Sequence, residues 1–403
     1  MNKGSFILEI KKNLTNIGPA ALISATAMGP GTITSCLLAG SAEGYRLLWF
    51  VAFSGFFAAS LAILGGKVYI VTGKLPFEII SQSFGKWLAY INYCLILLSG
   101  YYVVAVEGKL MGFALKTIFP SLGYLSKTFI VLAVVILIAV IFSFGFRRVI
   151  FFCTLLSACM ALLFFLNFFV ADISWKDLLL GLIPRFPEKK IGYLAMAGIM
   201  GGAAPGIIIM MYAYCVKNKN WTKISDLKQM RWDQYIYLGI LFGLFSVSIY
   251  ISGAAMLYGE VIVKNLGQAA ASLKPIAGMF GIWIFSIGIF TTVFTTIGGL
   301  ANVLSYFLAD LIKIPSDLDN RKFKKILFCT ILIAALGSFM EDLPIMQHLP
   351  LAMVFFLISG LICFAVYLVV SNKKSVMGDQ INHFTYNIIL ISLFIFDCFF
   401  SIY

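Results

Sequence analysis

Long apolar segments dominate this sequence and restrict what it can fold into. Eleven segments follow one another with short connections, each about the 20 residues that a helix needs to cross a bilayer. Hydrophobic residues make up 61% of the chain and charged residues 12%, whereas charged residues are roughly a quarter of a soluble domain. We therefore expect an all-α polytopic membrane protein with eleven transmembrane helices, at about 18–41, 46–72, 87–116, 127–146, 149–171, 191–216, 233–259, 276–311, 324–341, 350–371 and 384–403.

Two of these segments contain helix breakers. The first carries Met-Gly-Pro-Gly-Thr at 28–32, and the second carries Gly-Gly-Ala-Ala-Pro-Gly at 201–206. Proline removes a helical hydrogen-bond donor, and glycine lets the backbone leave the helix. One break alone is typical of a simple kink. Unpaired backbone groups at membrane depth persist only where protein buries them or where they line a cavity, so the pair predicts a substrate site between two halves of a transporter.

Basic residues are distributed unevenly over the connections. Far more of them fall on the side of the N-terminus than on the opposite side, and this bias predicts a cytoplasmic N-terminus and, after eleven crossings, an outside C-terminus. Segments one to five and six to ten then enter the membrane from opposite sides. We expect a single transporter domain, 1–403, with one repeat at about 18–171, a second at about 191–371 and an extra helix at 384–403. The net charge of +13 lies in loops, so it does not indicate nucleic-acid binding.

Several stretches resemble a known family. Residues 39–49 (AGSAEGYRLLW), with 71–74 (VTGK) and Glu78 beyond, resemble the first two helices of the natural-resistance-associated macrophage proteins, which are divalent-metal transporters. Residues 371–382 resemble that family's loop between helices ten and eleven. The resemblance implies a LeuT-like fold of two inverted five-helix repeats, with helices one and six broken at the midplane. We expect a monomer in a bacterial cytoplasmic membrane, with no cofactor.

The resemblance fails at the metal-binding motifs. Gly29–Thr32 stands where the family has Asp-Pro-Gly-Asn, Ala204–Gly206 replaces Met-Pro-His, and Met211 occupies the position of a frequent second histidine. The four aligned ligand positions therefore supply no carboxylate, amide, thioether or imidazole for a soft transition metal. We expect cadmium to bind weakly, and the metal ligands stay unassigned. The predicted substrate-binding residues are those of the two breaks: Gly29, Pro30, Gly31, Thr32, Ala204, Pro205 and Gly206.

Two substrate chemistries fit what remains at these breaks. Backbone groups, with the hydroxyls of Thr32, Thr34 and Ser35, can cradle a hydrated hard cation such as magnesium, which prefers oxygen contacts. Helix N-termini can equally face the carboxylate of a small zwitterion. The hydroxyl-rich run 291–299 resembles the family's eighth helix, and such a run more often packs helices than binds solute.

Glu107 is the acidic residue that the sequence places deep in a span. An intramembrane carboxylate is costly, so it is a candidate for cation attraction or for a proton path. Lys109, two residues on, points to nearly the opposite helix face and cannot neutralise it within the same helix. We expect Asp310 and Asp397 to be solvated near span ends. His348, like His383, is expected in a loop.

The function hypotheses follow in order. The first is a secondary transporter that moves a divalent cation, such as magnesium or manganese, by alternating access. The second is a transporter of a small organic solute such as an amino acid, and the third is a non-transporting scaffold or sensor of the same fold, since fold does not fix substrate.

Neither a hydrolase motif nor a Walker loop is present, so we expect no enzyme. With the family's histidine missing, we expect uniport or weak proton coupling, with Glu107 as a fixed negative charge.

Overall fold

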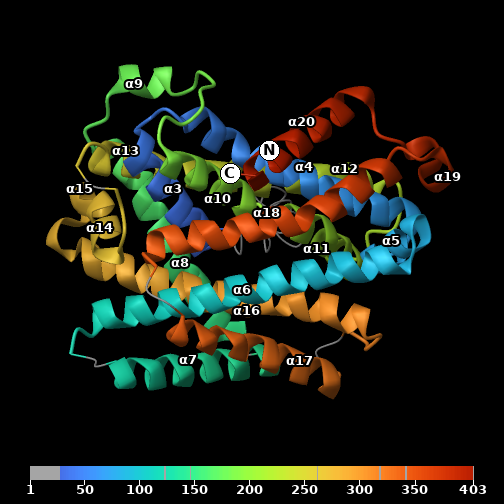
Figure 1. Ribbon diagram of the computed structural model, residues 1–403, viewed down its shortest axis with the longest axis horizontal. Helices are drawn as coiled ribbons and strands as arrows, with labels where there is room; N and C mark the ends of the chain where they lie inside the picture. Colours follow the sequence, from blue (N-terminus) through green and yellow to red (C-terminus); the bar gives the residue numbers. More distant parts are fainter. Residues whose placement is uncertain are drawn as a thin grey trace, which may run out of the picture.

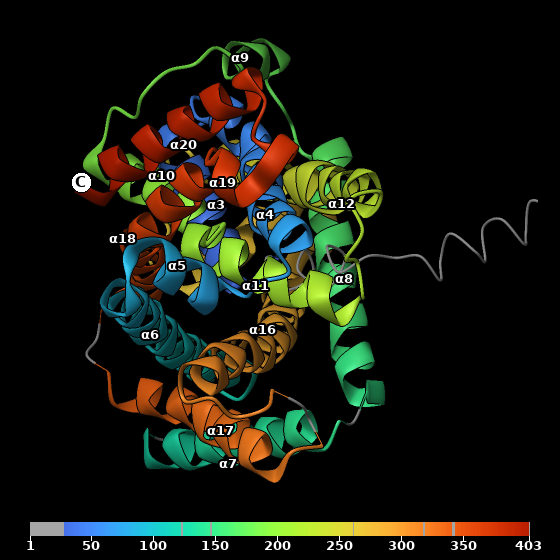
Figure 2. The same cartoon turned by 90° about the vertical axis from the view of Figure 1, so that its right-hand side faces the viewer.

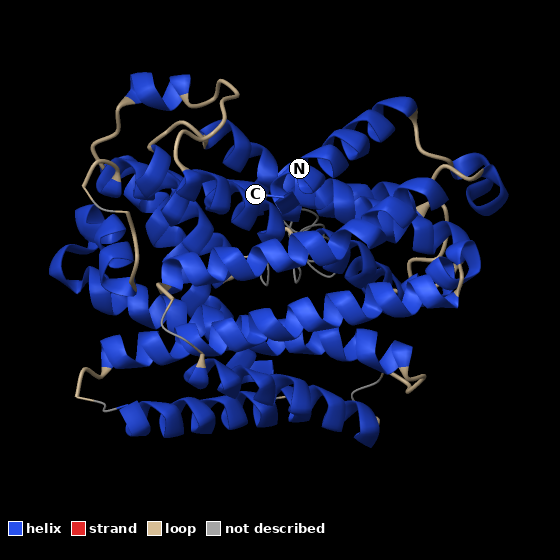
Figure 3. Ribbon diagram, in the orientation of Figure 1, coloured by secondary structure: helices blue, strands red, loops and turns tan. Residues whose placement is uncertain are grey.

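The computed structural model describes residues 28–121, 124–145, 147–260, 262–316, 319–340 and 343–402. Within these ranges every element is helical (Figure 3). The longer helices are α3 (Pro30–Glu43), α4 (Leu48–Thr72), α6 (Lys86–Ile118), α7 (Tyr124–Phe144), α8 (Arg147–Val170), α10 (Lys190–Gly202), α11 (Pro205–Asn218), α13 (Gly243–Leu257), α16 (Gly281–Leu311), α17 (Arg321–Leu332), α18 (Ile345–Val370) and α20 (Phe384–Ile402). The shorter ones are α5 (Pro76–Phe84), α9 (Trp175–Leu180), α12 (Asp226–Gln234), the π-helix η1 (Tyr235–Phe242), α14 (Leu266–Ala270), η2 (Ala271–Leu273), α15 (Lys274–Ala277), η3 (Gly278–Phe280), η4 (Ile333–Phe339), α19 (Lys374–Met377) and η5 (Gly378–Gln380).

Eight stretches of the described ranges are long and apolar enough to cross a membrane: Leu48–Thr72, Lys86–Ile118, Phe151–Val170, Lys190–Asn218, Asp226–Leu257, Leu266–Leu311, Ile345–Val370 and Phe384–Ile402. This confirms the prediction of an all-helical, polytopic membrane protein. Three predicted spans are not among the eight. The first predicted span, 18–41, lies partly before Met28, outside the described residues. The fourth, 127–146, corresponds to the apolar helix Thr128–Phe144, which is shorter than the eight stretches. In the ninth, α17 gives way at Ile333 to the tighter 3₁₀ helix η4.

The helices are arranged around a central group formed by α3, α10, α11 and α18. Helix α3 packs on α10, α13 and α18, and α11 packs on α4 and α18. Helices α6 and α16 lie along this group, and the pair α7 and α17 lies beyond them at one edge of the molecule (Figure 1, Figure 2). The two helix breaks are therefore brought together inside the bundle, away from the edge pair.

Small residues let η4 lie directly on α6. A Cβ on Gly108 of α6 would clash with the carbonyl of Ala334, and a Cβ on Gly337 of η4 would clash with the carbonyl of Ala105. Such backbone-to-backbone approach is how helices pack in a membrane, where the hydrophobic effect does not drive them together. The contact holds the part of α6 that contains Glu107 against η4.

Hydrogen bonds of Glu43 and Lys189 connect the end of α3 to the start of α10. The carboxylate of Glu43 accepts hydrogen bonds from the backbone N–H groups of Glu188, at 3.0 Å, and Lys189, at 2.9 Å. The Nζ of Lys189 donates in return to the carbonyl of Ala42 at 2.8 Å. A carboxylate at a helix N-terminus also interacts favourably with the helix dipole. Helices α3 and α10 are thus tied together at one end.

Candidate functional site

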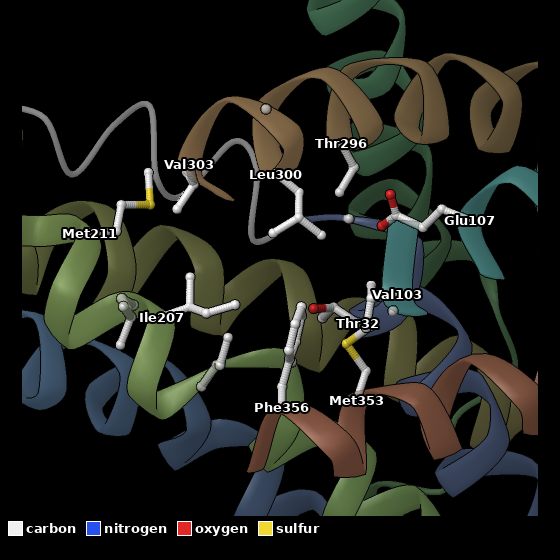
Figure 4. Close-up of a pocket in the computed structure, with 17 residues that line it drawn as sticks. Thr32, Val103, Glu107, Ile207, Met211, Thr296, Leu300, Val303, Met353 and Phe356 are labelled. Atoms are coloured by element: carbon white, nitrogen blue, oxygen red, sulfur yellow. The ribbon is translucent and has the colours of Figure 1, made fainter. Parts of the chain in front are cut away.

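A cavity of about 100 Å³ lies where the two breaks meet. Its wall comes from α3, α6, α10, α11, α16 and α18, and Figure 4 shows how the side chains project into it. The lining residues are Gly29, Gly31, Thr32, Val103, Glu107, Gly202, Ala203, Ala204, Ile207, Ile208, Met211, Thr296, Gly299, Leu300, Val303, Met353 and Phe356. The space accommodates several water molecules, each of which needs roughly 10–15 Å³ of such volume.

The first break is described from its second half. Helix α3 begins at Pro30, and Gly29 before it is extended, with φ −78° and ψ 176°. Proline suits this first helical position because the N–H that it lacks would have no partner there. Gly29, Gly31 and Thr32 line the cavity, whereas Pro30 is not among the lining residues. The part of the predicted first span before Met28 lies outside the described residues.

The second break is seen on both sides. Helix α10 ends at Gly202, α11 begins at Pro205, and Ala204 between them has φ 44° and ψ 65°. This left-handed conformation is uncommon for a residue other than glycine and costs about 1–3 kcal/mol. Ala204 lines the cavity. Pro205 and Gly206 are not among the lining residues, and Gly206 packs against the backbone of α18 at Gly360.

Glu107 lies on the cavity wall. The residue is 1% exposed, and its Oε2 has no hydrogen-bond partner in the part of the chain that the structure describes. Figure 4 shows the carboxylate turned toward the cavity, above Val103 of the same helix. An ionised carboxylate buried without a partner costs several kcal/mol. Either a proton or a cation in the cavity would remove this cost.

Lys109 lies outside the cavity and has its own contacts. Its Nζ is 3.2 Å from the carbonyl oxygen of Leu343 and 3.3 Å from Nδ1 of His348. The other ring nitrogen of His348, Nε2, is 2.9 Å from the hydroxyl of Tyr102. The prediction that His348 lies in a loop is wrong: it is buried in α18, which begins five residues before the predicted span. His383 lies in a connection, as predicted.

The hydroxyl groups near the first break have different surroundings. Thr32 lines the cavity, while the hydroxyl of Thr34 donates to the carbonyl of Gly31 at 3.1 Å. Ser35 is buried and faces Gly198 of α10. Thr296 of α16 also lines the cavity, while its hydroxyl donates to the carbonyl of Thr292 at 2.7 Å. The polar run of α16 therefore both packs its own helix and contributes one residue to the site.

Two thioethers line the cavity, which alignment to the family's motifs did not predict. Met353 comes from α18 and Met211 from α11 (Figure 4). A Cβ on Gly31 would lie 2.8 Å from the sulfur of Met353, so this sulfur lies directly against the first break. The four aligned positions lack both a carboxylate and a thioether, but the cavity as a whole contains both. The breaks supply neither group, and α6, α11 and α18 bring them in from elsewhere.

Two aspartates lie outside the cavity. Asp397 of α20 is 1% exposed, and neither carboxylate oxygen has a hydrogen-bond partner in the described ranges. Asp310 is half-buried at the end of α16, and its Oδ2 accepts hydrogen bonds from Tyr93, at 2.9 Å, and Tyr214, at 2.5 Å. The prediction of solvation is wrong for Asp397, because neighbouring helices cover the face of α20 on which it lies, whereas Asp310 remains partly exposed.

The described residues of the cavity do not include a cluster of the side chains that usually bind a metal ion together. Among the residues that the structure describes, no three His, Cys, Asp or Glu side chains gather closely enough to hold a metal ion. The cavity instead has one carboxylate, two hydroxyls, two thioethers and the backbone of the breaks. This set can receive a cation that keeps part of its water shell, because few protein ligands replace water.

Comparison with known proteins agrees with this arrangement of helices and breaks. The family model described as natural resistance-associated macrophage protein-like (Nramp) matches residues 20–403. The chain belongs to this family. A curated Nramp relative, the divalent metal cation transporter MntH of Caldanaerobacter subterraneus subsp. tengcongensis, is 26% identical over 302 residues, which are 72% of this chain and 70% of that protein. Family membership confirms the interpretation of the chain as a transporter and not an enzyme.

Solved structures show the same fold. A manganese transporter from Eremococcus coleocola superposes with a TM-score of 0.75 at 18% identity, covering 97% of this chain and 86% of that one. Mhp1, a nucleobase-cation-symport-1 family transporter in a closed conformation, superposes with a TM-score of 0.57 at 13% identity, over 96% of this chain and 91% of that one. At these identities the likeness shows the fold alone. The prediction of an all-helical polytopic membrane protein that shares the fold of these transporters is thereby confirmed.

Proposed function

We propose that this Nramp-family protein is a secondary transporter that moves a divalent metal cation across the membrane by alternating access. The observation that carries the proposal is the buried cavity between the two helix breaks, with a Glu107 oxygen that has no hydrogen-bond partner in the described ranges. Helix breaks at a cavity are where transporters of inverted-repeat architecture bind their substrates. The curated relative and the solved structure quoted above are named for divalent metal cation and manganese transport.

The topology belongs to the same proposal. Eleven crossings form one domain, 1–403, with inverted repeats at about 18–171 and 191–371 and an extra helix at 384–403. The N-terminus lies in the cytoplasm and the C-terminus outside, because lysine and arginine favour the cytoplasmic connections. The protein acts as a monomer in a bacterial cytoplasmic membrane. The meeting of α3 with α10 and α11 at one cavity supports this arrangement.

The donor atoms and the size of the cavity favour a small cation, magnesium or manganese. A space of about 100 Å³ is below the roughly 300–1,000 Å³ of sites for drug-sized organic ligands. It is lined by Gly29, Gly31, Thr32 and Ala204. The continuous helix is interrupted by Pro30, Pro205 and Gly206. Oxygen donors suit either ion, while a thioether favours the softer manganese.

Uptake into liposomes tests the proposal. Purified protein is reconstituted, and manganese and magnesium entry is measured beside entry of radiolabelled amino acids. We expect saturable cation uptake above protein-free liposomes. Amino-acid flux without cation flux would show an organic-solute transporter, and no flux of either kind would show a scaffold or sensor of the same fold.

Met353 provides a selectivity prediction. In Met353→Leu, which keeps the side-chain volume but removes the sulfur, we expect cadmium to inhibit manganese uptake about tenfold less strongly. Magnesium uptake should change less than about twofold, because hard cations gain little from thioethers. Met346→Leu is the matched control, since Met346 is buried in the same helix and is not among the lining residues. Equal cadmium inhibition in both variants would place the soft-metal contact elsewhere.

Proton coupling gives a second prediction. His348 and Lys109 are not among the residues that line the cavity, which leaves Glu107 as its one ionisable lining residue in the described ranges. We expect cation entry without stoichiometric proton entry, monitored by a pH dye inside the liposomes during uptake. Acidification in proportion to cation entry in wild type, with fewer protons for each cation transported in Glu107→Gln, would instead identify Glu107 as a proton carrier.

A further inference from the structure

A basic groove lies away from the central cavity, between α4, α12, η1 and the connection from α18 to α20. Two adjoining cavities of about 310 and 690 Å³ share Arg231, Tyr235 and Gln380 as lining residues. Lys67 and His383 line the smaller cavity, and Lys228 lines the larger one. No aspartate or glutamate of the described ranges is among the lining residues of either cavity. The groove therefore collects positive charge without a matching negative charge.

Lys67 makes this concentration of charge costly. Its side chain is buried, and its Nζ donates to Oδ1 of Asn382 at 2.7 Å, the one hydrogen bond of this ammonium group in the described ranges. Arg231 lines the same cavity and has no ion pair or hydrogen bond with the residues that the structure describes. The carboxylate of Asp233, close by in sequence, accepts a hydrogen bond from Tyr212. Two cations that share a pocket repel each other unless an anion lies between them.

Exposed apolar side chains extend from the groove along α12 and η1. Trp232, Ile236 and Ile240 are spaced four residues apart along α12 and η1, so they lie on one helix face, and all three are exposed, at 61%, 43% and 48%. Helix α12 packs against α4 at the same end of the bundle as α19 (Figure 1). A ligand with an anionic head and a long apolar tail matches both parts of this surface.

We propose that this groove binds the phosphate headgroup of an anionic phospholipid, with an acyl chain along Trp232, Ile236 and Ile240. Arg231 and Lys67 contact the phosphate, and Lys228 adds a charge at the entrance. Basic pockets between membrane helices on the cytoplasmic side recognise such headgroups, and this groove lies on the side to which the basic residues assign the cytoplasm. The site is separate from the central cavity, so the inference stands whatever cation is carried.

Native mass spectrometry of the detergent-purified protein tests the site. The protein is given equimolar phosphatidylglycerol and phosphatidylcholine with identical acyl chains. We expect wild type to retain phosphatidylglycerol preferentially, and Arg231→Gln to lower that preference about fivefold, the contribution of one basic residue near an anionic surface. Arg321→Gln, an exposed arginine at the start of α17, is the matched control and should behave as wild type.

Each alternative outcome has a definite meaning. Equal retention of the two lipids by wild type overturns the proposal without any variant. Equal preference in Arg231→Gln and Arg321→Gln overturns the assignment to this groove, once both variants show wild-type thermal unfolding and gel filtration. Calorimetric binding of inorganic phosphate tighter than about 1 mM, abolished in Arg231→Gln, would assign the groove to a soluble phosphate and overturn the lipid.

Discussion

Replacing Glu107 by glutamine is expected to weaken manganese or magnesium uptake by about 100-fold to 4,000-fold. The carboxylate is buried on the wall of the cavity, and one of its oxygens has no hydrogen-bond partner in the described ranges. A cation that enters pairs with this charge in a poorly screened environment, and loss of one partner of a buried pair costs about 3–5 kcal/mol. At about 1.4 kcal/mol for each factor of ten, this gives the stated range. The measurement is the concentration dependence of uptake into liposomes.

Asp397→Asn is the control for Glu107→Gln. Asp397 is also a buried carboxylate without a hydrogen-bond partner in the described ranges, but it lies on α20 and is not among the residues that line the cavity. We expect its neutral variant to transport within about twofold of wild type. If both variants transport normally, Glu107 is not a substrate contact. If both fail alike, buried charge supports the fold and not the site.

Restoring a continuous helix at the first break is expected to abolish transport without preventing membrane insertion. The variant is Pro30→Ala with Gly31→Ala. In a helix interior, proline costs about 3 kcal/mol and glycine about 1 kcal/mol relative to alanine, so the double change favours the continuous helix by about 4 kcal/mol. We expect uptake to fall by two orders of magnitude or more. The new Cβ at residue 31 meets the sulfur of Met353 at 2.8 Å, the flexible end of a side chain that can move aside.

A proline at the same position of another helix provides the control. Pro76 begins α5 as Pro30 begins α3, and it is not among the cavity residues. Pro76→Ala should therefore transport within about twofold of wild type. Expression in the membrane fraction and a single gel-filtration peak check the insertion of both variants. Normal flux in the double variant would show that the first break is only a kink.

Features encoded locally could be predicted from the sequence. Proline and glycine at 29–31 and 204–206 act on their own backbone, so the positions of the breaks needed no tertiary information. A charge inside an apolar span is equally visible, because its cost depends on the membrane and not on the neighbouring helix. Of the residues predicted in this way, Glu107, Gly29, Gly31, Thr32 and Ala204 line the cavity.

Features that depend on packing could not be predicted. Helix α18 is apolar on all sides, so no periodicity in its sequence shows that Met353 faces the cavity. The sequence predicts a loop at His348, yet the helix starts earlier, after Pro344. The burial of Asp397 depends on which face of α20 rests on its neighbours. The errors at Met353 and Asp397 concern the direction of a side chain, and the error at His348 concerns the residue at which a helix begins.

The ties between Glu43, Lys189 and the ends of α3 and α10 bear on how the transporter moves. Three hydrogen bonds join these two helices at one end, and their other ends, at Gly29 and Gly202, meet at the cavity. Because α3 and α10 are joined in this way, we expect them to move as one rigid body. The substrate contacts of both helices would then keep the same relative positions during transport. If α10 moves relative to α11, we expect the change in backbone angles at Ala204, whose left-handed conformation already interrupts the helix.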